Sequence, residues 1–245
     1  MKVIVTNSYD ESCKVVAEMI RDVVNQKPAC KLGLATGGTP VPIYKKLIEM
    51  NKAGEVDFSQ VHTVNLDEYC GIPGTHDQSY RYFMDTNLFN HINIDKANTY
   101  VAKGMGGFEA NAAELESKVR EGGAADLQLL GIGNNGHIAF NEASDHLISV
   151  AHIETLTEST INANARFFEK KEDVPTKAIT MGMGDIMAAK CVVLVATGLA
   201  KVPAIKGLVM DDVITTQNPS TMLKMHENAV VVIDKELADA VGYKA

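Results

Sequence analysis

Three features are missing from the sequence, and each absence excludes a class of protein. No apolar run approaches the roughly 18 residues of a membrane span, and a predicted strand stands where a signal peptide would be. No phosphate loop of the form G-x-x-x-x-G-K-S/T occurs, which argues against a nucleoside triphosphate ligand. No C-x-x-C spacing occurs among the four cysteines, which suits a reducing compartment. We therefore expect a cytoplasmic protein with no membrane partner.

Positive charge is also scarce. Lys and Arg number 23 against 31 Asp and Glu, so the formal net charge is −8. This balance argues against nucleic acid as a partner, and an anionic small ligand would need a local cationic pocket. Hydrophobic residues make up 46% of the 245 residues, and no repeat, low-complexity tract or linker interrupts them. We therefore predict one catalytic domain spanning residues 1–245.

Strand and helix patterns alternate along the chain. Short apolar runs predict strands at residues 3–6, 31–35, 61–65, 99–101, 127–130, 151–156, 178–181, 191–196 and 229–233. Helical spacing predicts helices after residues 8–10 and after Pro40, at 78–89 and 108–121, and through Ile205 and Val209. Continuous apolar strands are typical of parallel sheets. We therefore predict an α/β fold of three layers, with a mostly parallel sheet covered by helices on both faces.

Residues 127–142 combine a buried strand with a glycine-rich turn. Gly131, Gly133 and Gly136 follow the apolar run, and His137 and Glu142 come next. The carboxyl end of a strand is where open α/β sheets place their binding and catalytic groups. A catalytic loop, with His137 as acid/base and Glu142 orienting it, is one interpretation. A structural histidine buried in a tight turn is the other.

The same glycines also fit the dinucleotide fingerprint G-x-G-x-x-G, with Glu154 at about the distance of a ribose ligand. That fingerprint should open a helix, yet residues 138–144 lack a clear helical face. The next predicted strand begins at residue 151, too soon for a full crossover helix. This spacing argues against a dinucleotide site.

A second glycine turn suggests an anion site. Thr36, Gly37, Gly38 and Thr39 lie between a strand and a helix start, where free backbone N–H groups and the positive helix end attract anions. A plain tight turn is the alternative. Lys201 favours the anion site. A cation near a helix N-terminus interacts unfavourably with the positive end of the helix dipole, by roughly 0.3–1 kcal/mol, and a bound anion would offset this.

Asp67 and Glu68 follow another strand and enter a predicted loop. One of them could be a general base at the edge of the sheet. A helix N-cap beside a solvated acid is an equally good interpretation of this pair.

Several of these motifs, in this order, resemble the glucosamine-6-phosphate deaminase (isomerase) family. The resemblance covers nearly the whole chain and rests on residues 34–40, 65–69, 76–84, 131–142, 159–168 and 178–184. It implies the modified Rossmann-like fold of that family. It also implies conversion of D-glucosamine 6-phosphate and water to D-fructose 6-phosphate and ammonia, in amino-sugar catabolism, without a metal or redox cofactor.

The resemblance assigns roles to residues. It implies that His137 opens the pyranose ring, that Glu142 and Asn135 support His137, and that Asp67 moves a proton from C2 to C1. Positioned acid/base groups of this kind contribute about 10²–10⁴-fold each. It also implies a phosphate cradle made of Thr36, Gly37, Gly38, Thr39, Arg166 and Lys201.

The sequence departs from the family pattern at two places. Many members carry aspartate at the position of Asn135, so we hypothesise that Glu142 alone supplies the negative charge beside His137. Allosteric hexameric members carry basic residues where this chain has His152 and Glu154. We therefore predict a monomer or small homo-oligomer that N-acetylglucosamine 6-phosphate does not activate.

Three alternatives remain beside this interpretation. A 6-phosphogluconolactonase has a similar glycine-histidine loop, but residues 140–142 differ from the pattern of that hydrolase. A sugar-phosphate sensing domain of a transcriptional regulator would need a DNA-binding segment, which the acidic chain does not provide. Galactosamine 6-phosphate differs from glucosamine 6-phosphate by one epimeric hydroxyl and stays open as a substrate.

Overall fold

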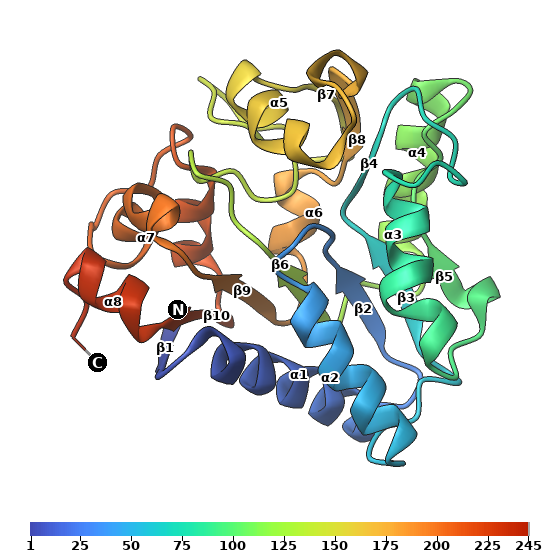
Figure 1. The fold of residues 1–245 in the computed structure, drawn as a ribbon, viewed down its shortest axis with the longest axis horizontal. Coiled ribbons are helices and arrows are strands. Elements are labelled where there is room, and N and C mark those ends of the chain that lie inside the picture. The colour runs from blue at the N-terminus through green and yellow to red at the C-terminus, as the bar shows by residue number, and fades with distance from the viewer. Residues whose placement is uncertain (245) are drawn as a thin grey trace.

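A parallel sheet forms the centre of the computed structural model, which describes residues 1–244. Within these residues the sheet has seven strands (Figure 1). In spatial order they are β1 (Lys2–Thr6), β10 (Ala229–Asp234), β9 (Val192–Ala196), β6 (Leu127–Leu130), β2 (Lys31–Leu34), β3 (His62–Asn65) and β5 (Thr99–Tyr100). All neighbouring strands run parallel. Every residue of β6, β9 and β10 is buried, which explains their continuous apolar sequence.

Helices surround this sheet, so the predicted α/β architecture is confirmed. They are α1 (Tyr9–Gln26), α2 (Val41–Lys52), α3 (Tyr80–Asn87), α4 (Phe108–Arg120), α5 (Glu158–Asn164), α6 (Met183–Met187), α7 (Val202–Val209) and α8 (Lys235–Val241). Ser8 is the N-cap of α1, because its hydroxyl accepts a hydrogen bond from the Glu11 amide at 3.2 Å. None of the helices formed by residues 1–244 is both long and apolar enough to cross a membrane.

A second, antiparallel sheet was not predicted. Its order is β4 (Asp67–Tyr69), β8 (Lys177–Thr180) and β7 (His152–Thr155). The expectation that Asp67 and Glu68 lie in a loop was therefore wrong, because both are strand residues. The chain changes sheets at Leu66, whose amide bonds to Leu34 of β2 while its carbonyl accepts from Met181 after β8. A three-residue strand is too short to show an alternating pattern in sequence.

Candidate active site

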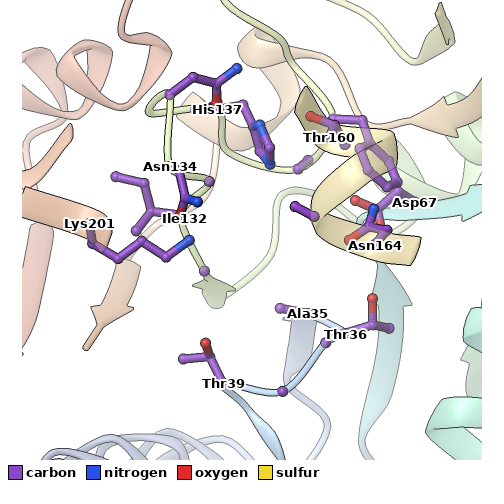
Figure 2. A pocket seen from close by; sticks show the side chains of 18 of the residues that line it. Ala35, Thr36, Thr39, Asp67, Ile132, Asn134, His137, Thr160, Asn164 and Lys201 are labelled. Carbon is purple, nitrogen blue, oxygen red and sulfur yellow. Dashed lines mark hydrogen bonds between the residues drawn. The ribbon is translucent and has the colours of Figure 1, made fainter. Parts of the chain in front are cut away.

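One cavity of about 640 Å³ lies where β2, β6 and β9 of the parallel sheet end (Figure 2). Residues at or just after the ends of several strands line it, namely residues 36–39, Asp67, Asn134, Asn135, His137, Thr197, Ala200 and Lys201. The 3₁₀ turn Ala165–Phe167, which continues α5, also contributes to the wall. The predicted site residues that line the cavity are Thr36, Gly37, Gly38, Thr39, Asp67, Asn135, His137, Arg166 and Lys201. Glu142 lies behind this wall and is only 5% exposed.

The turn of residues 36–39 has the geometry of an anion site. Gly37 has φ +95°, a conformation that favours glycine. Within residues 1–244, the amides of residues 37–39 donate to no other backbone group, so they stay free for a ligand. Two phenols fix the turn: Tyr44 Oη donates to the Ala35 carbonyl and Tyr9 Oη to the Thr39 carbonyl, both at 2.5 Å.

Two cations face the cavity near this turn. Lys201 directly precedes α7 and points inward in Figure 2, and Arg166 follows α5. Burial lowers the pKa of Lys201, and the neighbouring charge of Arg166 lowers it further. Neither cation forms an ion pair with any carboxylate among the described residues 1–244, so an anionic ligand would relieve their repulsion.

The loop after β6 places His137 on the cavity wall. A Cβ atom at Gly133 would lie 2.3–2.4 Å from three atoms of the His137 imidazole, so the ring occupies the space that only glycine leaves free. The Gly133 amide donates to the His137 carbonyl at 2.9 Å and closes the turn. No helix begins after Gly136, since residues 138–141 form an irregular turn. The dinucleotide interpretation, which required a helix there, does not hold.

Glu142 is the hub of a hydrogen-bond network. Its Oε2 atom lies 3.3 Å from His137 Nδ1 and accepts from Asn135 Nδ2 at 2.8 Å. Its Oε1 atom accepts from the hydroxyl of Thr157 at 3.3 Å and from that of Thr160. Burial alone would raise the pKa of Glu142, but His137, Thr160 and Asn135 together lower it to about 2. Glu142 is therefore held as an anion.

Asn135 contacts both Glu142 and the backbone of His137. Its amide nitrogen donates to Glu142 at 2.8 Å, and its Oδ1 atom accepts from the backbone N–H of His137 at 3.2 Å. With aspartate at this position, two carboxylates would face each other and repel. Thr157 and Thr160 were not found from the sequence. The T-x-x-T pattern marks Thr157 as the N-cap of α5, but it does not reveal the contact with Glu142.

Asp67 and Glu68 have separate roles. Glu68 does not line the cavity; it accepts backbone hydrogen bonds from Tyr69 and from Tyr80 and Arg81 in the first turn of α3, at 2.9–3.1 Å. Asp67 faces the cavity (Figure 2). Burial and the charge of Glu68 raise the pKa of Asp67 to about 8. Burial raises the pKa of Glu68 as well, to about 7, so position and not pKa separates the pair. Asp67 is the member that lines the cavity and can reach a bound ligand.

Aromatic side chains beside Asp67 were also missed from the sequence. Tyr80 and Phe140 both line the cavity and stack with an interplanar angle of 11° and ring centroids 6.2 Å apart. Tyr69 packs against both rings, at 4.9 Å and 5.8 Å. These apolar rings form part of the cavity wall that Asp67 also lines.

Comparisons with known proteins identify the family of the chain. The model of the family described as glucosamine-6-phosphate isomerases/6-phosphogluconolactonase matches residues 6–232. A glucosamine-6-phosphate deaminase of Clostridium beijerinckii (strain ATCC 51743 / NCIMB 8052) is 52% identical over 242 residues, which cover 98% of this chain and 100% of the relative. A glucosamine-6-phosphate deaminase of Clostridium perfringens (strain 13 / Type A) is 51% identical over 239 residues, which cover 97% of this chain and 98% of the relative.

Two solved structures have similar folds to this chain. A monomeric glucosamine-6-phosphate deaminase matches with a TM-score of 0.95 at 37% identity, covering 98% of this chain and all of that one. A 6-phosphogluconolactonase from Thermotoga maritima has a TM-score of 0.75 at 20% identity, covering 96% and 99% of the two chains, so it shares the fold alone. The chain belongs to the glucosamine-6-phosphate isomerase/6-phosphogluconolactonase family.

Proposed function

We propose that this protein is a glucosamine-6-phosphate deaminase, an enzyme that converts D-glucosamine 6-phosphate and water to D-fructose 6-phosphate and ammonia. The observation that carries the proposal is one cavity with an anion site at residues 36–39, two cations, an imidazole and a buried carboxyl group. Relatives named glucosamine-6-phosphate deaminase, about half identical over nearly the full chain, support the same function. We expect a single cytoplasmic catalytic domain.

The phosphate end of the cavity holds the substrate in this proposal. The free amides of residues 37–39, the hydroxyls of Thr36 and Thr39, and the cations Arg166 and Lys201 bind the 6-phosphate. Binding at this end positions C1 and C2 of the sugar near the acid/base groups. Such positioning converts remote binding energy into rate.

Ring opening is the first chemical step. His137 takes the proton from the anomeric hydroxyl and returns it to the ring oxygen, which leaves an open-chain aldehyde. The imidazole carries a positive charge between these two transfers, and the Glu142 carboxylate 3.3 Å away stabilises that charge. Asn135 and Thr160 keep Glu142 in place and ionised.

Isomerisation and hydrolysis complete the reaction. Asp67 takes the proton from C2, which gives an enolamine, and then delivers a proton to C1, which gives an imine at C2. Water adds to C2, and the C–N bond breaks to release ammonia and fructose 6-phosphate. A single carboxylate on a rigid strand can reach two adjacent carbons, and the position of Asp67 on β4 supports this role.

The lack of allosteric activation is part of the proposal. On β7, the imidazole of His152 lies 3.2 Å from the carboxylate of Glu154. A carboxylate at this position would repel a phosphorylated effector. We therefore propose a monomer or small homo-oligomer that works without a sugar-phosphate activator.

An assay of purified protein with three substrates tests the function. We expect ammonia and fructose 6-phosphate in equal amounts from glucosamine 6-phosphate. Hydrolysis of 6-phosphogluconolactone, but no ammonia from glucosamine 6-phosphate, would contradict the proposal. Galactosamine 6-phosphate as the third substrate measures how strictly the site selects the C4 epimer.

A further inference from the structure

One turn, residues 215–221, holds the loop of the acid/base pair at both of its ends. At the start of the loop, directly before the histidine, the Ser220 amide donates to the Gly136 carbonyl at 2.9 Å. At the far end, two residues after the glutamate, Gln217 Nε2 donates to the Ser144 carbonyl at 2.8 Å. Residues 215–221 themselves do not line the cavity, so they support the loop from behind.

Asn218, at the centre of this turn, fills a space that two glycines leave open. A Cβ atom at Gly136 would lie 1.9 Å from Asn218 Oδ1, and a Cβ atom at Gly207 would lie 2.7 Å from Asn218 Nδ2. Gly207 is inside α7, where glycine is less favourable than alanine, so its presence there needs a packing reason. The side chain of Asn218 gives that reason, because its Nδ2 atom also donates to the Ala204 carbonyl of α7 at 2.9 Å.

The side chain of Asn218 is itself fixed in place. Ser220 Oγ donates to Asn218 Oδ1 at 2.6 Å, and Thr221 Oγ1 donates to the Asn218 carbonyl at 2.7 Å. Helix α7 is anchored by its buried face, which belongs to the main hydrophobic core. The loop that follows Gly136 is irregular and depends on individual contacts for its position. Asn218 therefore connects a fixed helix to a loop that needs support.

We propose that Asn218 is a positioning residue: by holding Gly136 against α7, it keeps the imidazole of His137 at its distance from the neighbouring carboxylate. This inference rests on the proposed function and deepens it, because His137 and Glu142 open the sugar ring there. The distance at stake is the 3.3 Å between His137 Nδ1 and Glu142 Oε2. A misplacement of about 1 Å can cost about 10²-fold in rate, even when the substituted residue is far from the chemistry.

Two variants displace this contact from different sides. Asn218→Ala removes the side chain. Gly207→Ala adds a methyl group 2.7 Å from Asn218 Nδ2, so the amide has to move. Alanine within a helix should otherwise stabilise the protein, so lower activity in a Gly207→Ala protein that melts no earlier than the wild type reports displacement and not unfolding. Asn25→Ala is the matched control, because it removes a 2.9 Å hydrogen bond from an exposed amide to the Glu55 carbonyl.

We expect kcat for ammonia release to fall about 10–100-fold in Asn218→Ala, and in the same direction in Gly207→Ala. KM for glucosamine 6-phosphate and the affinity for glucitol 6-phosphate, an open-chain ligand that cannot react, should stay unchanged, because the phosphate site is intact. In the double variant, Gly207→Ala should lower kcat no further than Asn218→Ala alone, because the side chain that it displaces is gone. Asn25→Ala should behave as the wild type.

The imidazole proton signals of His137 in NMR spectra, assigned with His137→Gln, give a readout that does not require turnover. They should shift in Asn218→Ala and in Gly207→Ala and stay in place in Asn25→Ala. Should Asn218→Ala not fold, the signals and the kcat of Gly207→Ala still decide.

Two kinds of outcome are distinguishable. Unchanged His137 signals and unchanged kcat, or losses that multiply in the double variant, would overturn the role of Asn218, although the proposed deamination could still stand on its own assay. Shifted signals in a protein whose wild type releases no ammonia would support the contact and refute the proposed function.

Discussion

Substitutions of Glu142 and Asn135, whose side chains are hydrogen-bonded to each other, should reduce activity to very different extents. Glu142→Gln removes the carboxylate that lies 3.3 Å from the imidazole of His137. It also puts an amide beside the side chains of Asn135, Thr157 and Thr160, which all donate to Glu142. We expect kcat/KM for ammonia release to fall about 10²–10⁴-fold, the usual contribution of such an acid/base group. The isosteric change leaves the shape of the site intact.

Asn135→Ala removes one of the donors to Glu142 and leaves the hydroxyls of Thr157 and Thr160 and the contact with His137. One hydrogen bond to a charged group contributes about 1.5–3 kcal/mol, so we expect a loss near tenfold, at the low end of that range. The assay is ammonia release from glucosamine 6-phosphate, with melting curves to confirm folding. Equal losses in the two variants would refute the claim that Glu142 alone supplies the negative charge beside His137.

Four further predictions follow from the site. Thr160→Val should lower kcat about tenfold with little change in KM, because the hydrogen bond from its hydroxyl to Glu142 is lost. Thr160→Ser and Thr155→Val, a control at an exposed position, should retain activity. Lys201→Ala should raise KM for glucosamine 6-phosphate about 10–100-fold and hardly affect the slow reaction of unphosphorylated glucosamine; equal effects on both would place Lys201 away from the phosphate. Asp67→Asn should raise the melting temperature, with a gain that grows from pH 4 to pH 8. The pKa of Asp67 is raised to about 8 in the folded protein, so the folded wild type is most stable below the ordinary pKa of aspartate and loses stability as pH rises through 8. A gain independent of pH would contradict that shift. Rate curves with and without N-acetylglucosamine 6-phosphate should coincide, because Glu154 repels its phosphate.

The sequence was informative where local patterns have a direct structural cause. Apolar runs such as β9 and β10 predicted buried parallel strands, and the topology then required their carboxyl ends to meet. The turn of residues 36–39 and His137 were found because glycine marks either an unusual backbone angle, as at Gly37, or a place with no room for a side chain. The ring of His137 against Gly133 is such a place.

The remaining features depend on tertiary contacts. The three residues of β4 acquire their strand partner from β8, more than 100 positions away, so the placement of Asp67 and Glu68 could not be predicted. Asn135 lies two residues before His137 in sequence, yet the loop turns its side-chain amide toward Glu142. The hydroxyl of Thr160 reaches the same carboxylate only because α5 packs over this loop. No spacing rule reports such contacts.

Transfer of deuterium from [2-²H]glucosamine 6-phosphate tests the central claim most directly, that Asp67 and His137 act on one sugar held by residues 36–39. For the wild type and for Asp212→Asn, a matched change at an exposed position, we predict ammonia release together with fructose 6-phosphate that carries part of the deuterium at C1, measured by NMR. For Asp67→Asn we predict ammonia release slower by about 10²–10⁴-fold. Ammonia release by Asp67→Asn at the wild-type rate, or wild-type protein that releases none, would contradict the account.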